Sequence, residues 1–262
     1  RFTASTKIWQ RLAEQHSDVS DYQRSLSIPI LKLAEMDLTE GKPDAARGGL
    51  TASLKIWQRL TQRHPDVPDY QRSLSMPMLL ISDMDLAAGN AKAARAGLTA
   101  SLKIWQRLTD EHPDVPDYQR GLAVVQYKLA AVAISQLEYA SAMSLHRSAL
   151  TSLQALTRAD PTLPIYKVDI ASNLFWLALL DAVQYLQKDH PSIGAIHDLV
   201  MLEIRKDRRE QSSRFQAVGQ VVAGISIPHE RRAELSLVRD SLKSLFDAGS
   251  LDEYGKDWLT LI

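Results

Sequence analysis

The segment TASLKIWQRLTQRHPDVPDYQRSL, residues 51–74, decides the fold because the chain contains it three times. Residues 3–26 read TASTKIWQRLAEQHSDVSDYQRSL, and residues 99–122 read TASLKIWQRLTDEHPDVPDYQRGL. The matching tryptophans Trp9, Trp57 and Trp105 set a period of 48 residues. A fixed period of this length predicts a stack of similar units, each too small to bury its apolar face alone.

A degenerate fourth copy continues the register, with Leu153 in the place of the tryptophan. We therefore predict a repeat array over 1–190. It divides into a half-unit at 1–18, repeats at about 19–66, 67–114 and 115–162, and a degenerate repeat at 163–190. Residues 191–262 lose the register, and we interpret them as a C-terminal helical cap that covers the last apolar face.

Composition and charge narrow the function classes. Apolar residues make up 45% of the chain and charged residues 24%, and the 31 basic and 31 acidic side chains balance. A chain without net charge is a poor candidate for general nucleic-acid binding. Cysteine is absent, and no apolar run reaches the roughly 18 residues of a membrane helix, so we expect a cytoplasmic protein without membrane association. The chain opens inside a repeat, and we expect it to belong to a longer protein.

Helix breakers divide each repeat into two helices, which we call helix A and helix B. His64-Pro65 and His112-Pro113 end helix B, because the residue before proline disfavours the helical region. Gly41 and Gly89 end helix A, as glycine does at helix C-termini. We predict helix A at about 21–40, 69–88, 117–136 and 163–187, and helix B at about 43–64, 91–112 and 139–159, after a half-unit helix at 3–16.

Two positions depart from this simple pattern. Pro29 and Pro77 fall inside helix A, where proline costs about 3 kcal/mol unless the fold compensates. We favour a short separate helix or turn at 21–28, over a bend in one long helix. In the third repeat Leu137 replaces the glycine, so we expect that turn to be built differently.

Small residues recur where helices must approach closely, and their spacing resembles the tetratricopeptide repeat. The matching sets are Ala34–Ala46–Leu50–Ser53, Ser82–Ala94–Leu98–Ser101 and Ala130–Ala142–His146–Ala149. The tetratricopeptide period is 34 residues, so this array resembles an extended form. KIWQRLTQRHPDVPDYQRSLSMPMLLIS at 55–82 looks like the AIxxRLAxxxPxxxxxQRDLSxSxxxIG repeats of large bacterial multidomain signalling and defence proteins. Pro77 and the missing glycine after Ile81 depart from that pattern. HEAT or armadillo repeats are the structural alternative.

The resemblance implies an all-α, right-handed superhelical solenoid of antiparallel helix pairs that binds a protein partner on the concave face, which helix A lines. The exposed concave positions would be Leu31, Glu35, Leu38, Leu79, Asp83, Leu86, Tyr127, Ala131, Ile134 and Phe175. The strip lacks the Lys/Arg–Asn carboxylate clamp of chaperone-binding members. A partner protein, a peptide, or another domain of the same protein would fill this face. The alternative interpretation is that several of these residues pack against the next repeat.

Catalytic signatures are missing from the sequence: it has no GxxxxGK[ST], GxSxG, HExxH or GxGxxG motif. We therefore predict a non-catalytic scaffold that needs no cofactor or metal. A basic run at Arg205, Lys206, Arg208 and Arg209 is interleaved with acidic residues, which is typical of a solvated helix face. Two alternatives stay open: self-association through the near-identical repeats, and, less favoured, nucleic-acid binding by the basic run.

Overall fold

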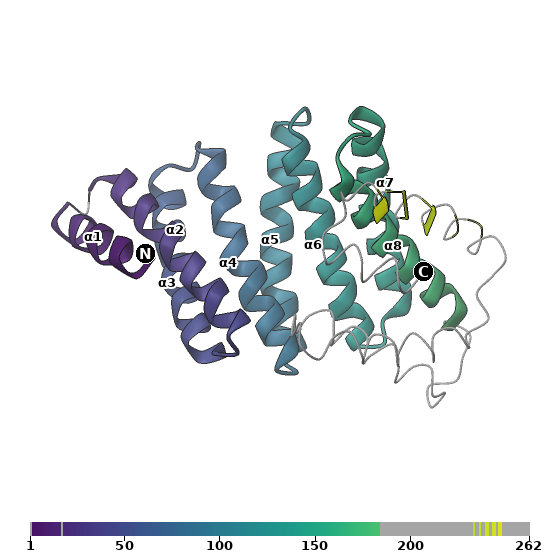
Figure 1. Ribbon diagram of the computed structural model, residues 1–262, viewed down its shortest axis with the longest axis horizontal. Coiled ribbons are helices and arrows are strands. Elements are labelled where there is room, and N and C mark those ends of the chain that lie inside the picture. Colours follow the sequence, from purple (N-terminus) through teal and green to yellow (C-terminus); the bar gives the residue numbers. More distant parts are fainter. Residues whose placement is uncertain are drawn as a thin grey trace. The chain divides into compact units, whose positions relative to one another are not determined.

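The structure is a computed structural model that describes residues 2–16 and 18–183, together with isolated residues between 233 and 247. Over residues 2–183, apart from residue 17, it forms eight α-helices in chain order (Figure 1). They are α1 (Phe2–Gln15), α2 (Ser20–Thr39), α3 (Pro43–Arg63), α4 (Pro68–Ala87), α5 (Ala91–Glu111), α6 (Pro116–Ser135), α7 (Tyr139–Ala159) and α8 (Pro164–Val183). None of the helices in this described part combines the length and apolar character needed to cross a membrane.

The chain divides into two compact units, Arg1–Asp110 and Glu111–Ile262. In the N-terminal unit α1 packs on α2, α2 on α3, and α3 on α4. In the C-terminal unit α6 packs on α7, and α7 packs on α8. This sequential packing confirms the prediction of an all-helical architecture built from neighbouring helices. The described residues between 233 and 247 are helical, and the remainder of the predicted cap lies outside the described residues.

Proline and glycine place the helix ends almost where the sequence predicts them. Pro43, Pro68 and Pro116 lie in the first turn of α3, α4 and α6, where a missing N–H costs no hydrogen bond. α3 ends at Arg63, one residue before His64-Pro65. The predicted bounds for the helices between residues 20 and 159 differ from the observed ones by a single residue or not at all.

The prediction of a separate segment before Pro29 is wrong. Helix α2 runs unbroken from Ser20 to Thr39 with Pro29 inside it, and α4 contains Pro77 in the same way. Both prolines are buried. Burial of the rings and of their helix neighbours offsets the hydrogen bond that each proline removes, so packing overrides the local signal.

The turn after α6 also contradicts the expectation of a different construction. Gly41 and Gly89 adopt left-handed φ angles of 72° and 80°, and Leu137 adopts the same conformation at φ 60°. The same hydrogen bond closes all three turns. The backbone N–H of the residue that follows the left-handed one donates to the carbonyl oxygen five residues earlier. The N···O distances are 2.8 Å after Gly41, 2.7 Å after Gly89 and 2.8 Å after Leu137. Leu137 therefore completes the same turn with a side chain that disfavours it.

The predicted close approach of small residues is confirmed. Ala34, Ala46, Ala94, Ala130 and Ala142 are all at most 1% exposed. A side chain on Gly97 would place its Cβ 2.4 Å from the Ser82 hydroxyl of α4. The helices of a pair thus meet backbone to backbone at these points.

The repeated tryptophans of the second and third copies lie in the core. Trp57 is 4% exposed and Trp105 is 7% exposed. Trp57 packs with Leu60, Ile56 and Leu26 of the same repeat, and its ring lies 5.9 Å from that of Tyr70. Helix α8 matches its prediction as well, since residues 171–180 are all buried.

A buried pair of serine hydroxyls joins helix A to helix B in the first two repeats. Ser27 and Ser53 share a hydrogen bond of 2.7 Å, and Ser75 and Ser101 repeat it at 2.7 Å. The Trp105 indole N–H donates to the Ser75 hydroxyl at 2.6 Å. In the third repeat the positions that match these two serines and the tryptophan are Ala123, Ala149 and Leu153, all buried. The polar residues have changed together, because a single buried hydroxyl without a partner costs about 1–3 kcal/mol.

We expect Leu137→Gly to raise the free energy of unfolding of the C-terminal unit by about 1 kcal/mol, because it removes the left-handed strain of leucine. Chemical denaturation followed by circular dichroism measures it. Gly89→Leu is the matched reverse substitution and should lower stability by a similar amount. A destabilised Leu137→Gly variant would show that the leucine side chain is held by packing instead.

We expect Ser53→Ala to lower the free energy of unfolding by about 1–3 kcal/mol, because Ser27 loses its partner in the core. The double variant Ser27→Ala/Ser53→Ala, which copies Ala123 and Ala149, should be more stable than Ser53→Ala alone. A double-mutant cycle by urea denaturation tests this non-additivity. Strictly additive costs would contradict the paired role.

Candidate functional site

The ten residues predicted to line a concave face lie on α2, α4, α6 and α8. Leu31, Glu35 and Leu38 of α2, Asp83 of α4 and Tyr127 of α6 are half-buried. The expectation that all ten are exposed is wrong for Leu79, Leu86, Ala131, Ile134 and Phe175, which are at most 9% exposed. Residues 129–134 of α6 are buried without interruption, so here helix A contributes to the core on more than one side.

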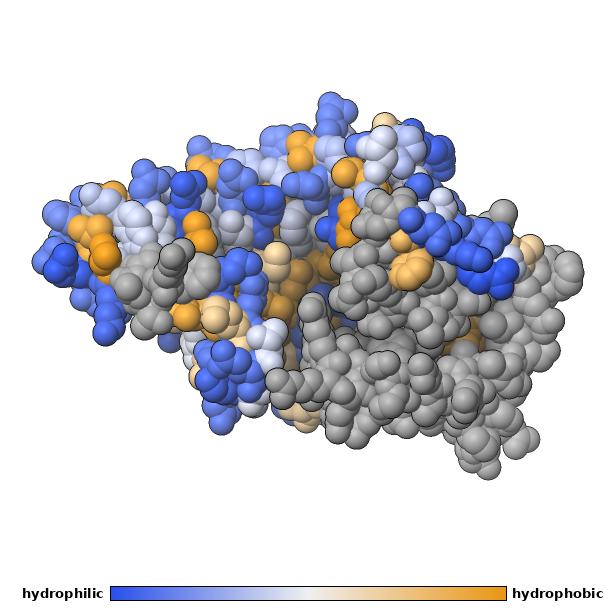
Figure 2. Space-filling model, viewed as in Figure 1, coloured by the Kyte–Doolittle hydropathy of each residue, from blue (hydrophilic) through white to orange (hydrophobic). Residues whose placement is uncertain are grey.

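The accessible part of α2 and α4 combines apolar and charged side chains. Ile28 and Met76, which occupy matching positions of two repeats, are 52% and 46% exposed. Lys32 pairs with Glu35 at 2.7 Å along α2. On the face drawn in Figure 2 the N-terminal unit is mostly hydrophilic, with small separate hydrophobic patches. Protein-binding faces share such a mixture of apolar and polar side chains with the rest of a protein surface.

An ion pair ties the two helix pairs of the N-terminal unit together. Arg47 of α3 contacts Asp85 of α4 through Nη2 and Oδ1 at 2.8 Å, and Asp85 has a side chain only 15% exposed. Arg47 is repeated as Arg95, and Asp85 is repeated from Asp37, so both positions recur with the 48-residue period. The contact does not recur at the next repeat, where Ala133 occupies the position of Asp85.

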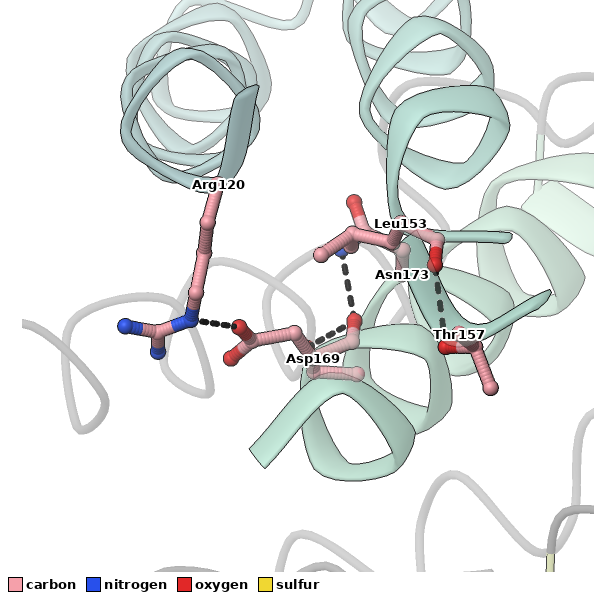
Figure 3. Close-up of polar contacts among 6 residues, drawn as sticks. Arg120, Leu153, Thr157, Asp169 and Asn173 are labelled. Carbon is pink, nitrogen blue, oxygen red and sulfur yellow. Dashed lines mark hydrogen bonds and ion pairs between the residues drawn. The ribbon is translucent and has the colours of Figure 1, made fainter. Parts of the chain in front are cut away.

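A polar cluster connects α6, α7 and α8 of the C-terminal unit. Arg120 of α6 donates from Nε to Asp169 of α8 at 2.8 Å (Figure 3). Asn173 lies one turn beyond Asp169 and donates from Nδ2 to its backbone carbonyl at 2.7 Å. On α7, the Thr157 hydroxyl donates to the Leu153 carbonyl at 2.9 Å. The contact of Arg120 with Asp169 therefore joins α6 to α8, whereas the bonds of Asn173 and Thr157 each lie within one helix.

His146 of α7 extends this cluster through Asn173 and is 1% exposed. Its Nδ1 lies 2.9 Å from Asn173 Oδ1, and its Nε2 is buried without a hydrogen-bond partner. Its ring stacks at 8° on Trp176, with ring centroids 6.3 Å apart, and meets Tyr127 edge-on at 5.4 Å. The Trp176 indole N–H donates to the Tyr127 hydroxyl at 2.9 Å.

Burial lowers the pKa of His146 to about 4, and the hydrogen bond to Asn173 opposes that shift only in part. The imidazole is therefore neutral at physiological pH, with Nδ1–H as the donor to the Asn173 oxygen. A neutral ring shut into the core cannot reach a substrate, so the cluster stabilises the helix contacts and does not form a catalytic base.

The repeat register contains the signal that locates this histidine. His146 occupies the position of Leu50 and Leu98, and Asn173 occupies that of Val125. A histidine and an amide that replace apolar core residues in one repeat indicate a buried polar pair. Our sequence analysis placed His146 in the repeat pattern but assigned it no role.

The predicted basic run is the remaining set of predicted site residues. Arg205, Lys206, Arg208 and Arg209 lie outside the described residues. Within the part of the chain that the structure describes, no group of three or more His, Cys, Asp or Glu side chains is arranged to hold a metal ion.

No protein-family model matches the chain. No curated protein matches it in sequence either.

We expect the stability of the C-terminal unit to fall by about 3 kcal/mol as the pH drops from about 6.5 to about 4. In that range the unfolded chain protonates His146, whereas the folded chain does so only near its lowered pKa of about 4. Urea denaturation at a series of pH values measures the effect.

The variant His146→Leu/Asn173→Val introduces the residues that occupy the matching positions 98 and 125, and it serves as the control. It retains the carboxylates that also titrate in this range, so it should lose only the histidine contribution. An unchanged pH dependence in this variant would contradict the assignment to His146.

Proposed function

We propose that this chain is a non-catalytic scaffold for protein–protein recognition, built as a right-handed superhelix of extended tetratricopeptide-like helix pairs. By the resemblance of its repeats, it would serve as the sensor or regulatory region of a larger bacterial signalling or defence protein. Its partner would be another protein, a peptide, or another domain of the same protein.

One observation carries this proposal: the two halves of the repeat differ in how far the copies have diverged. Between 51–74 and 99–122 only Gln62, Arg63 and Ser73 change, to Asp110, Glu111 and Gly121. Between the following segments, 75–98 and 123–146, only Ala94 and Ala142 agree, whereas 27–50 and 75–98 agree at 12 of 24 positions, so the divergence is greatest in the third repeat. We call 51–74 and its matching copies the constant half, and 27–50, 75–98 and 123–146 the variable half.

The constant half supplies the packing that holds the repeats together. It contains the buried Trp57 and Leu60, the histidine ring at residue 64 and Tyr70, whose ring meets that histidine edge-on at 5.8 Å. Packing of this kind must be kept in each copy, because each copy meets its neighbour in the same way. Packing therefore explains most of the identity between copies in this half, without a bound ligand.

The variable half forms the second part of helix A, the left-handed turn and the first part of helix B. Matching positions there carry different chemistry: Glu35 and Asp83 become Ala131, and Leu31 and Leu79 become Tyr127. Nine of the ten predicted concave residues fall in this half, and Phe175 lies beyond it. A uniform frame that presents different side chains from repeat to repeat is suited to recognising one irregular protein surface.

We expect Glu35→Lys/Asp83→Lys to weaken partner binding at least about tenfold, because reversed charges oppose a complementary surface. Affinity capture from native lysate identifies the partner, and calorimetry with the purified partner measures the loss. Glu35 and Asp83 are half-buried side chains outside the apolar core, so the variant should stay folded.

Asp66→Lys/Asp69→Lys places the same charge change on exposed residues of the constant half and should bind normally. Equal loss in both variants would contradict recognition by the variable half. A concentration-dependent mass in light scattering, with no other protein captured, would favour self-association instead.

A further inference from the structure

One surface of the N-terminal unit repeats a charged pattern that packing does not require. The helices α1, α3 and α5 each present Lys-x-x-Gln-Arg, and all of these lysine, glutamine and arginine side chains are exposed. They are Lys7, Gln10 and Arg11 on α1, Lys55, Gln58 and Arg59 on α3, and Lys103, Gln106 and Arg107 on α5.

Local helix energetics do not favour this pattern. Lysine and arginine four residues apart repel each other on one helix face, which is mildly destabilising. In α3 both residues precede the last turn, whose basic residue is Arg63, so the helix dipole does not account for them. Exposed charges in the variable half do change between copies, for instance Lys32 to Leu80 and Asp44 to Lys92. The exposed triplet nevertheless stays the same in the three copies.

The pattern is most cationic on α3. Gln62 and Arg63 follow the triplet there, where α1 has Glu14 and α5 has Asp110 and Glu111. On α1 the side-chain amide of Gln10 donates to the Glu14 carboxylate at 3.0 Å, so this glutamine already has a partner within its own helix. A surface hollow of about 400 Å³ is lined by Lys55, Gln58, Arg59 and Gln62 of α3.

We propose that this α3 stripe, Lys55, Gln58, Arg59 and Gln62, binds an extended acidic segment of a partner protein. The four residues follow the i, i+3, i+4, i+7 spacing of one helix face. Four residues of α-helix rise about 6 Å, so Lys55 and Arg59 are separated by that distance along the axis. Alternate residues of an extended peptide lie about 6.6 Å apart on one side. Two alternate carboxylates thus match the lysine and the arginine.

The glutamines favour a peptide over a nucleic acid. A side-chain amide both donates and accepts, so Gln58 and Gln62 can pair with the C=O and N–H of an extended backbone. A DNA phosphodiester backbone offers no donor. The tryptophan of this helix, Trp57, is buried and cannot stack on a base. The balanced charge of the whole chain also provides little long-range attraction for a polyanion.

This surface belongs to helix B and the constant half, so it is separate from the variable half of the proposed function. Either surface can fail its test without affecting the other. If both hold, the α3 stripe would bind an acidic segment of the partner, and the variable half would select which partner binds.

The probe is a fluorescein-labelled octapeptide that alternates glutamate and serine, titrated with the full chain and followed by fluorescence anisotropy. We expect saturable binding that Lys55→Glu/Arg59→Glu weakens at least about tenfold. Lys103→Glu/Arg107→Glu makes the same change on α5 and should weaken binding less than about threefold. Circular dichroism melts establish that both variants are folded.

Two results would overturn the proposal. The first is that the peptide does not bind saturably, or that Lys55→Glu/Arg59→Glu and Lys103→Glu/Arg107→Glu weaken its binding equally. The other is binding of an eight-nucleotide oligothymidine at least as tightly as the peptide, lost in Lys55→Glu/Arg59→Glu, which would assign the stripe to nucleic acid. A peptide that alternates glutamine and serine should not bind, and its binding would also exclude carboxylate recognition.

Discussion

A buried polar group needs a partner, and this constraint governs how the repeats are allowed to differ. The hydroxyls of Ser27 and Ser53 satisfy each other in a dry interface, and the third repeat replaces the matching pair by Ala123 and Ala149. The tryptophan whose N–H uses such a hydroxyl disappears in the same step, since Leu153 takes its place. His146 and Asn173 change together in the opposite direction, from apolar residues at the matching positions to a hydrogen-bonded pair, although His146 Nε2 is left without a partner. Core positions in this chain therefore change in sets, because a half-changed set leaves an unsatisfied group.

Much of the fold could be predicted from the sequence, because proline and glycine act locally. Pro43 and Pro68 begin helices and Gly41 ends one through backbone geometry that neighbours scarcely alter. The errors arise where tertiary packing opposes a local preference. Pro29 stays inside α2 because its ring is buried, and Leu137 accepts a left-handed φ because the turn that it completes is fixed by the helices on either side. A single sequence does not show when packing is strong enough to override such preferences.

The candidate site was less predictable than the fold. The positions on helix A followed from the resemblance, but their exposure depends on what covers each helix. Leu79 and Ile134 are buried although the repeat pattern places them beside the half-buried Asp83 and Tyr127. The role of His146 could have been predicted from its register with Leu50 and Leu98. Its partners could not, since Tyr127 and Trp176 lie far from it in sequence and come together only through packing.

The variable half is one continuous segment that includes the left-handed turn, and this has a genetic consequence. Its ends lie in sequence that is nearly the same in neighbouring copies, so recombination between copies can join them without altering the flanking residues. One exchange would then replace the second part of helix A, the turn and the first part of helix B together. The two helical segments would come from the same copy and would already pack against each other. Array length and surface could change by whole repeats, and the tryptophan and tyrosine contacts at each junction would be inherited intact.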